Sequence, residues 1–311
     1  MADDLHDGGF GGSPPHGLPQ GAIDFHIHPF RLGHFQSRDA RALVARANPS
    51  LNVGALAEED EVIPRARLES ELDAAGIAYG VLLPQHTPGV GIELPTDYVL
   101  AYRAGSSRLI PFASVNPLGD ANPLDELRRW VDAGAKGLKL YPSYQFFYPN
   151  DPRLYPIYEF ARSLSWPVMF HTGSSIFSGS RLKYALPIHL DDVAVDFPDL
   201  RIVLAHAGRV AWAAEAVALA RVHPNVYLEI SGLPPRTVLR HIPDLPRITD
   251  KVVFGSDWPS TPSIAETVGG LLELGLTPGQ LARVFRDNAA ALLGWAGLGG
   301  RSSDERRAAQ A

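Results

Sequence analysis

The sequence predicts an α/β protein built as a single (β/α)8 TIM barrel, with an insertion after the first strand. Two observations support this class: eight short, nearly continuous apolar runs occur along the chain, and segments with helical periodicity lie between them. Such runs are typical of parallel strands that are buried on both faces, and regular alternation of strand and helix favours a barrel or a doubly wound sheet. No glycine-rich phosphate-binding turn follows the first run, so we favour the barrel.

The strands and helices are expected in the following order. The predicted strands are residues 22–27, 79–83, 109–115, 137–141, 167–171, 201–206, 226–230 and 251–255. One helix begins at Asn122 and Pro123 and ends near Gly134, because a capping residue and a first-turn proline open it and a glycine closes it. Further helices are expected at 152–164, 212–221 and 282–293. Residues 29–67 lack a clear strand, so we expect them to form the insertion, over the barrel mouth.

The chain is expected to contain one domain. A length of 311 residues suits a single barrel, and 45% hydrophobic and 20% charged residues are ordinary for a globular protein. Residues 1–20 are rich in Gly and Pro, and residues 299–311 are polar, so both ends are predicted to be flexible. The barrel is therefore predicted to span residues 21–298.

Composition excludes several kinds of function. The chain has no cysteine, which rules out disulfides, thiolate metal sites and cysteine nucleophiles. A net charge of −6 without a basic cluster argues against nucleic-acid binding. The first twenty residues do not resemble a signal peptide, and no apolar stretch approaches the ~20 residues that span a bilayer. We expect a cytoplasmic protein that does not bind membranes.

A pair of histidines lies at the end of the first predicted strand, in the stretch from Asp24 to Pro29. Side chains alternate across a strand, so His26 and His28 point the same way and can bind one metal ion from one side. The alternative is a chance pair of ordinary histidines.

Three more residues of the metal-binding type lie where other predicted strands end. His171 ends the fifth strand, His206 ends the sixth, and Asp257 follows the eighth. The carboxyl ends of the strands are where barrel active sites lie. Any one of these residues alone could be a satisfied polar residue or a helix cap, but the five together predict a metal site. Imidazoles with a carboxylate favour Zn²⁺, with Mn²⁺, Fe²⁺ or Co²⁺ as alternatives, whereas Ca²⁺ and Mg²⁺ prefer oxygen ligands.

The order of these motifs resembles the amidohydrolase superfamily. The motifs are HxH, HTG, HAG and GSDWP, and the resemblance covers roughly residues 23–295. It is greatest to the branch of aminocarboxymuconate-semialdehyde decarboxylase and of many TIM-barrel metal-dependent hydrolases. The resemblance implies that His26, His28, His171 and Asp257 bind the metal, with Asp257 also the general base. It implies that His206 is either a ligand of a second metal or a polarising acid.

Lys139, in the fourth predicted strand, allows three roles. Some superfamily members carry a carboxylated lysine on this strand that bridges two metals. The other roles are a free cation that binds a substrate anion, or an ion pair with Asp24 or Glu229. We favour the free cation or the ion pair, and therefore one metal ion rather than two.

Substrate contacts are expected from residues that follow the strands. Lys139, Tyr141, Arg209 and Trp258 are the candidates, and Arg209 could bind a carboxylate. For the aromatic residues, loop packing is the alternative. Glu229 could orient a ligand histidine from behind. The substrate is expected to be a small molecule, either carboxylate-bearing or cyclic, and a homodimer is compatible with the fold.

The site predicts a hydrolase that cleaves an amide, ester or lactone through metal-activated water. Zn²⁺ would lower the pKa of the water to ~7, Asp257 would take its proton, and His206 would stabilise the oxyanion or protonate the leaving group. The alternative is a metal-dependent, non-oxidative decarboxylase of an aromatic or muconate-like acid. A non-catalytic binding protein is a third hypothesis, disfavoured because all five residues are present.

Overall fold

The computed structural model describes Pro15 and residues 17–295. The predicted flexible tail 299–311 and most of the predicted flexible segment 1–20 lie outside the described residues. Within residues 17–20, Leu18 is buried against the core. No described helix is long and apolar enough to cross a membrane.

All eight predicted strands are present, and they are parallel to their neighbours. The strands are β1 (Ile23–Ile27), β2 (Tyr79–Leu82), β5 (Leu109–Pro111), β6 (Leu138–Leu140), β7 (Pro167–His171), β8 (Arg201–Ala205), β9 (Val226–Glu229) and β10 (Val252–Val253). Nearly every residue in them is buried, which explains why they read as continuous apolar runs.

Two sets of strands close into one ring. The order is β1-β2-β5 in one set and β10-β9-β8-β7-β6 in the other. Ala113, just beyond β5, joins β6 by backbone hydrogen bonds of 2.8 Å with Gly137 and with Lys139. On the other side, the Phe25 amide donates to the Phe254 carbonyl at 3.0 Å, and Ile27 bridges to Trp258. The predicted (β/α)8 barrel is confirmed.

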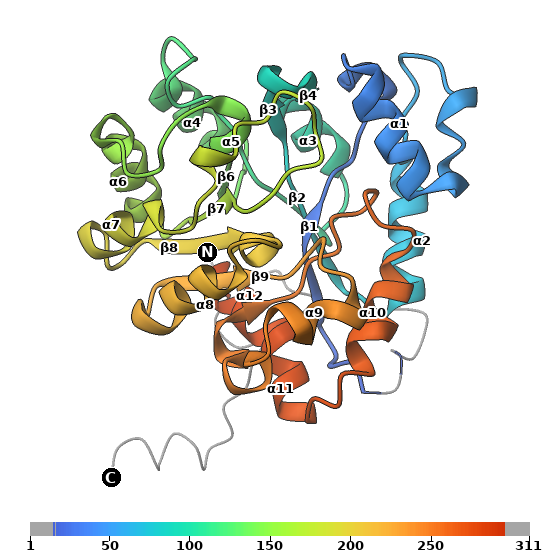
Figure 1. The fold of residues 1–311 in the computed structure, drawn as a ribbon. Helices are drawn as coiled ribbons and strands as arrows, with labels where there is room; N and C mark the ends of the chain where they lie inside the picture. Colours follow the sequence, from blue (N-terminus) through green and yellow to red (C-terminus); the bar gives the residue numbers. More distant parts are fainter. Residues whose placement is uncertain (1–14, 16, 296–311) are drawn as a thin grey trace.

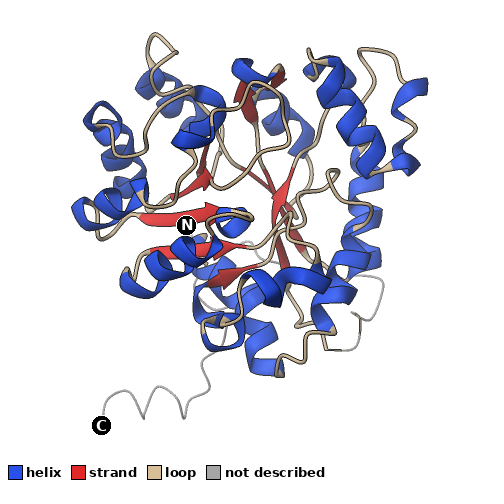
Figure 2. Cartoon of the chain, in the orientation of Figure 1, coloured by secondary structure: helices blue, strands red, loops and turns tan. Residues whose placement is uncertain are grey.

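The helices surround the strands on the outside (Figures 1 and 2). They are α1 (Arg38–Ala47), α2 (Arg65–Ala75), α3 (Thr96–Arg103), α4 (Pro123–Asp132), α5 (Pro142–Gln145), α6 (Tyr155–Ser163), α7 (His189–Asp196), α8 (Ala213–Val222), α9 (Pro235–His241), α10 (Ile264–Leu272), α11 (Pro278–Ala282) and α12 (Asn288–Leu292). Short 3-10 helices lie at Leu32–His34, Pro49–Leu51, Val53–Ala55, Pro88–Val90, Pro152–Leu154, Leu182–Tyr184, His206–Gly208, Leu245–Arg247 and Thr249–Lys251. Helices α2 and α10, far apart in sequence, pack side by side over the junction of the first and last strands.

The predicted helices at 122–134, 152–164 and 212–221 correspond to α4, α6 and α8. The predicted helix at 282–293 is instead interrupted by a π-helical turn, Arg283–Asp287, between α11 and α12. The carbonyl of Val284 in this turn accepts a hydrogen bond of 2.9 Å from the amide of Phe254. The wider turn therefore supports the end of β10, a contact that helical periodicity alone does not reveal.

Two segments lie over the barrel mouth in addition to the (β/α)8 elements. The expected insertion after β1 contains α1 and three of the 3-10 helices, and its Phe30, Phe35 and Val44 line the central cavity. An antiparallel hairpin of β3 (Gln85–Thr87) and β4 (Ile92–Leu94) follows β2 and was not predicted.

The barrel interior below the site is apolar. Phe25, Val81, Met169, Val203 and Val253 form a buried cluster inside the ring of strands. Ala289, Ala290 and Leu292 of α12 belong to the same cluster and close its lower end. The register of β1 against β2 shifts between Asp24 and Ile27, so the strand changes course just where the two histidines begin.

Candidate metal centre

His26, His28 and Asp257 form the first group of candidate ligands. The Nε2 atoms of the two histidines lie 3.1 Å apart. Oδ1 of Asp257 lies 3.4 Å from Nε2 of His26 and 3.6 Å from Nε2 of His28. Each residue offers one ligand atom, and these atoms all lie within 4.8 Å of one another. The sequence prediction that both histidines face the same side is confirmed.

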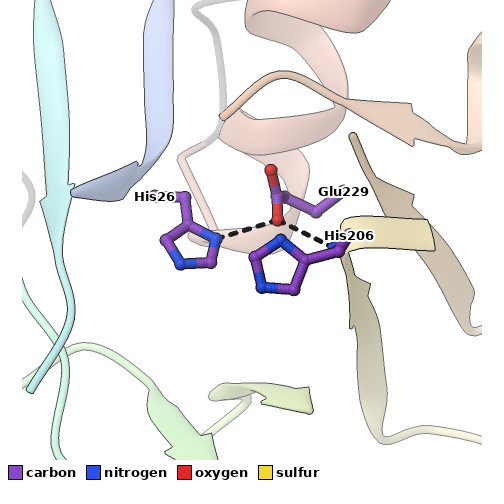
Figure 3. A group of neighbouring side chains, drawn as sticks. All are labelled: His26, His206 and Glu229. Atoms are coloured by element: carbon purple, nitrogen blue, oxygen red, sulfur yellow. Dashed lines mark hydrogen bonds and ion pairs between the residues drawn. The ribbon is translucent and has the colours of Figure 1, made fainter. Parts of the chain in front are cut away.

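Glu229 supports His26 from the side away from this group. Its Oε2 lies 2.9 Å from Nδ1 of His26 and accepts a hydrogen bond of 3.3 Å from the backbone amide of His206 (Figure 3). The hydroxyl of Ser231 lies 3.1 Å from Nδ1 of His26 and 3.0 Å from Nδ1 of His206. A carboxylate at Nδ1 fixes the ring and leaves the Nε2 lone pair free, as is usual for metal-binding histidines.

His171 and His206 form a second pair. Nδ1 of His171 lies 3.1 Å from Nε2 of His206, and Nε2 of His171 lies 3.1 Å from the hydroxyl of Tyr144. That hydroxyl donates to Oγ of Ser175 at 2.9 Å, so it can accept from His171. The rings of His206 and His26 lie 5.0 Å apart between centroids, which places the two pairs next to each other.

Outer hydrogen bonds fix the tautomers of these rings. Nδ1 of His28 lies 2.9 Å from the carbonyl of Leu83, and Nδ1 of His206 lies 3.2 Å from the carbonyl of Ser231. A carbonyl oxygen only accepts, so both Nδ1 atoms carry the proton and both Nε2 atoms have a lone pair. Glu229 likewise accepts a hydrogen bond from Nδ1 of His26, and the Tyr144 hydroxyl accepts one from Nε2 of His171. Two pairs of ring nitrogens with free lone pairs therefore face each other. They are Nε2 of His26 with Nε2 of His28, and Nδ1 of His171 with Nε2 of His206.

Burial keeps the histidines neutral. It lowers the pKa of His28 to about 3 and the pKa values of His26, His171 and His206 well below the usual range, with Lys139 adding to the effect. Burial also raises the pKa of Asp257 to about 6, against the opposing charges of Arg209 and Lys139. Neutral imidazoles with inward lone pairs beside a carboxylate suit a divalent cation, so the residues present fit a metal ion.

The backbone at two strand ends is strained. His206, Ala207 and Asp257 have positive φ values of 63°, 46° and 59°. Residues other than glycine rarely adopt this left-handed region, and such outliers concentrate at functional sites. The strain turns the His206 and Asp257 side chains out of the strand pattern and toward the cluster.

Lys139 lies beneath the site without a partner. Its side chain is fully buried, and no hydrogen bond or ion pair to its Nζ occurs among residues 17–295. Nζ lies 5.1 Å from the centre of the Tyr141 ring. Burial lowers the pKa of Lys139 to about 7, although Glu229 and Asp257 oppose this shift. The expected ion pair with Asp24 or Glu229 is absent.

A cavity of about 1020 Å³ opens above the cluster. Among the predicted substrate contacts, Tyr141 and Arg209 line it. The Tyr141 hydroxyl is engaged, because it donates to the carbonyl of Pro84 at 2.6 Å. Lys139 and Trp258 are fully buried and do not belong to the cavity wall.

The guanidinium of Arg209 reaches the histidines across Gly232. A Cβ at Gly232 would collide with this guanidinium and would lie 3.3 Å from Nδ1 of His206, so a side chain at this position would push Arg209 away from its present place. Arg209 donates to the carbonyl of Ser174 at 3.3 Å, and no ion pair with a carboxylate occurs within the described part of the chain. The arrangement leaves a positive charge facing the cavity.

Sequence reasoning missed two residues of the site. Ser231 contacts both His26 and His206, and Tyr144 contacts His171. Ser231 could have been identified because it lies two residues after Glu229, on the same side of the strand. Tyr144 was visible only as one of several aromatic residues after the fourth strand.

A comparison with known protein families identifies the family of this chain. A family model described as Amidohydrolase matches residues 23–295. The chain belongs to the amidohydrolase family. It is an enzyme of that metal-dependent family, and the resemblance noted from the motifs is confirmed. A search of curated protein sequences finds no match.

Solved structures show the same fold in this family. An uncharacterised TIM-barrel protein from Bordetella bronchiseptica is 26% identical, covers 88% of this chain and 99% of its own, and superimposes with a TM-score of 0.73. A probable 2-pyrone-4,6-dicarboxylic acid hydrolase from Acinetobacter baumannii, with citric acid bound, is 18% identical, with coverage of 88% and 99% and a TM-score of 0.63. A 5-carboxyvanillate decarboxylase from Novosphingobium aromaticivorans, with manganese and a nitrobenzoic acid derivative, is 17% identical, with coverage of 88% and 97% and a TM-score of 0.60. This fold thus serves both a hydrolase and a decarboxylase.

Proposed function

We propose that this amidohydrolase family member hydrolyses an amide, ester or lactone bond of a small molecule, with one Zn²⁺ held by His26, His28, His171 and Asp257. The observation that carries the proposal is the set of inward lone pairs on neutral imidazoles next to the Asp257 carboxylate. A bound zinc ion supplies Lewis-acid polarisation of a carbonyl and lowers the pKa of a water molecule.

Asp257 is the proposed general base. Its Oδ1 lies 3.4 Å and 3.6 Å from the Nε2 atoms of His26 and His28, so its carboxylate would be within reach of a water molecule at the metal and could take its proton. His206 is proposed to receive at Nε2 the proton that Asp257 takes from the water; in that protonated state it would stabilise the oxyanion and then pass the proton to the leaving group. Its pKa lies well below the usual range, so a proton that reaches its Nε2 is readily given up.

Arg209 is the proposed anchor for a substrate carboxylate. It faces the cavity beside His206 and carries no compensating carboxylate within the described residues. The Tyr141 ring would cover the substrate. Lys139 and Trp258 are buried behind the cavity wall, so they would influence the substrate without touching it. Lys139 is proposed to be a free cation rather than a carboxylated bridge between two metals.

Metal-dependent decarboxylation of an aromatic or muconate-like acid is the second candidate. The free guanidinium of Arg209 near the proton-carrying groups also suits a carboxylate that is lost as CO₂. Turnover in H₂¹⁸O separates the two reactions, because hydrolysis places the label in the organic product, whereas decarboxylation releases CO₂ and leaves the organic product unlabelled.

Metal content tests the site first. Elemental mass spectrometry of protein purified without added metal or chelator should give about one equivalent of zinc per chain. Two equivalents would instead support a bridging carbamate on Lys139. No metal, before and after reconstitution, would contradict the proposal.

The substitution Asp257→Asn tests the mechanism. It should reduce turnover by about 10²–10⁴-fold, the usual contribution of a general base, while circular dichroism shows the fold intact and elemental analysis shows whether the metal is retained. Asp199→Asn, an exposed change far from the cavity, is the matched control. Full activity of Asp257→Asn would exclude the proposed role.

We also propose a cytoplasmic protein that acts on a small molecule without nucleic acid or membrane, with a barrel domain at 21–298. The proposed assembly is a homodimer, which sedimentation of the purified protein would test.

A further inference from the structure

The cavity above the metal centre is larger than the chemistry at its base requires. Its volume of about 1020 Å³ is at the upper end of the ~300–1,000 Å³ of pockets that hold drug-sized ligands. The metal centre contributes the histidines, Asp257 and Arg209 to its wall. A second set of lining residues, here called the outer arm, comes from segments beside the barrel mouth: Val44, Pro235, Gly269, Leu271 and Leu274.

Three separate segments build the outer arm. Val44 comes from the insertion after β1, Pro235 begins α9, and the other three residues belong to α10 or follow it. Helices α9 and α10 pack together beside the barrel mouth (Figure 1). These five residues are apolar, whereas the charged residues Arg236, Glu266 and Glu273, which also line the cavity, are exposed.

Two neighbouring glycines in α10 have different surroundings. A Cβ at Gly270 would lie 2.7 Å from Cβ of Pro235, so this glycine allows α9 to approach. A Cβ at Gly269 would meet no atom within 4 Å, although Gly269 lines the cavity. Glycine in a helix interior lowers stability relative to alanine, and no packing contact requires it at position 269. What the glycine does provide is open space in the arm.

We propose that the outer arm binds an apolar substituent of the substrate and that Gly269 is a specificity-determining residue that keeps the arm open. The substrate class is then an amphiphile: an acyl or carboxylate group at the metal centre and Arg209, and a hydrophobic tail of about six or more carbons along α10. This inference rests on the proposed function for the position of the polar end. A compact acid with a single ring would leave the arm empty.

Binding of a series of straight-chain carboxylates tests the proposal without turnover. Acetate, hexanoate and decanoate are titrated into the protein as purified, and dissociation constants and stoichiometry are measured by calorimetry. Each buried methylene strengthens binding by up to about fourfold, so decanoate should bind at least about tenfold more tightly than hexanoate, at one site per chain.

Two variants test whether the hydrocarbon tail of the ligand lies in the outer arm. Gly269→Phe should fill the arm, and Leu274→Asp should place a charge on its wall, so both should abolish the preference for decanoate while acetate binding stays unchanged. Gly279→Phe is the matched control, because Gly279 is also a helix glycine with no atom within 4 Å of a Cβ but lies outside the cavity wall. This control should retain the preference.

The outcomes separate this inference from the proposed function. Equal affinity for hexanoate and decanoate, or a length preference that both variants retain, would overturn the role of the outer arm and leave the metal-dependent chemistry standing. A length preference that depends on Gly269, in a protein that binds no metal, would support the arm and contradict the proposed hydrolase instead.

Discussion

Glu229 holds two of the histidines of the centre at once, through the His26 ring and the His206 backbone amide. Its two oxygens also accept hydrogen bonds from the backbone amide of Ser231 at 2.6 Å and from the Ser231 hydroxyl at 2.9 Å. Every neighbour is therefore a donor, and the pocket suits a carboxylate rather than an amide.

Glu229→Gln should lower the affinity for zinc by about 10–100-fold, the usual effect of losing the group that orients a ligand histidine. The amide NH₂ of glutamine would face a donor, so the His26 ring would lose its fixed orientation. Zinc affinity is measured by competition with a chelator. Glu93→Gln is the control, because Glu93 contacts His86 outside the metal centre. Equal zinc affinity in Glu229→Gln and the wild type would rule out this role.

The sequence predicted the residues of the centre better than their partners. These residues were identifiable because each lies at or just after the carboxyl end of a predicted strand: His26, His28, His171, His206 and Asp257. The unpaired state of Lys139 and the burial of Trp258 were not identifiable, since both depend on side chains from several strands. The outer arm was missed for the same reason: its walls come from α10 and from the insertion, which share no motif.

At the scale of the elements, the hairpin of β3 and β4 is held by the contacts of His86 with Glu93 and Asp120, here called the clasp. Nδ1 of His86 lies 2.5 Å from Oε2 of Glu93 in the opposite strand, and Nε2 lies 3.0 Å from Oδ1 of Asp120 in the loop before α4. These contacts, with Asp120 first, raise the pKa of His86 to about 10. The clasp connects the hairpin, whose Gln85 lines the cavity, to the neighbouring loop.

The clasp should make stability depend on pH. The folded pKa of His86 exceeds its value of about 6.5 in the unfolded chain, so its contribution is complete below about pH 6.5 and is lost as the pH rises through 10. The difference in unfolding free energy between the wild type and His86→Gln should therefore be larger at pH 6 than at pH 10. Denaturant unfolding measures this, with His189→Gln on α7 as the control. A difference that stays constant between these pH values would contradict the clasp.

At the scale of the elements, the sequence predicted the barrel strands better than the hairpin and the π-helical turn. All eight barrel strands were recovered because their apolar runs reflect burial on both faces. The hairpin was missed because its strands are three residues each, although Pro88, Gly89 and Gly91 between them are turn residues. The π-helical turn was missed because its reason is a contact with β10, distant in sequence.

At the scale of the whole molecule, the metal centre lies across the junction that closes the barrel. His26 and His28 belong to the first strand region, and Asp257 follows the last strand. The same junction is joined by backbone hydrogen bonds of 2.9 Å from Asp257 to His26 and from His28 to Trp258. A metal bound by these residues would connect the two ends of the fold, residues 26 and 257, as well as serve the chemistry.

Removal of the metal should therefore weaken this junction more than the rest of the barrel. Metal at 100 times its dissociation constant stabilises the folded state by ~2.7 kcal/mol, so chelation should lower the melting temperature. Hydrogen exchange locates the effect: the amides of His28 and Asp257 should lose protection on chelation, whereas those between β2 and β5 should change little, since neither strand carries a proposed ligand. The variant His26→Ala should show no further loss on chelation. An equal change in both regions would mean that the metal stabilises the barrel as a whole, and no change in either would place the metal elsewhere.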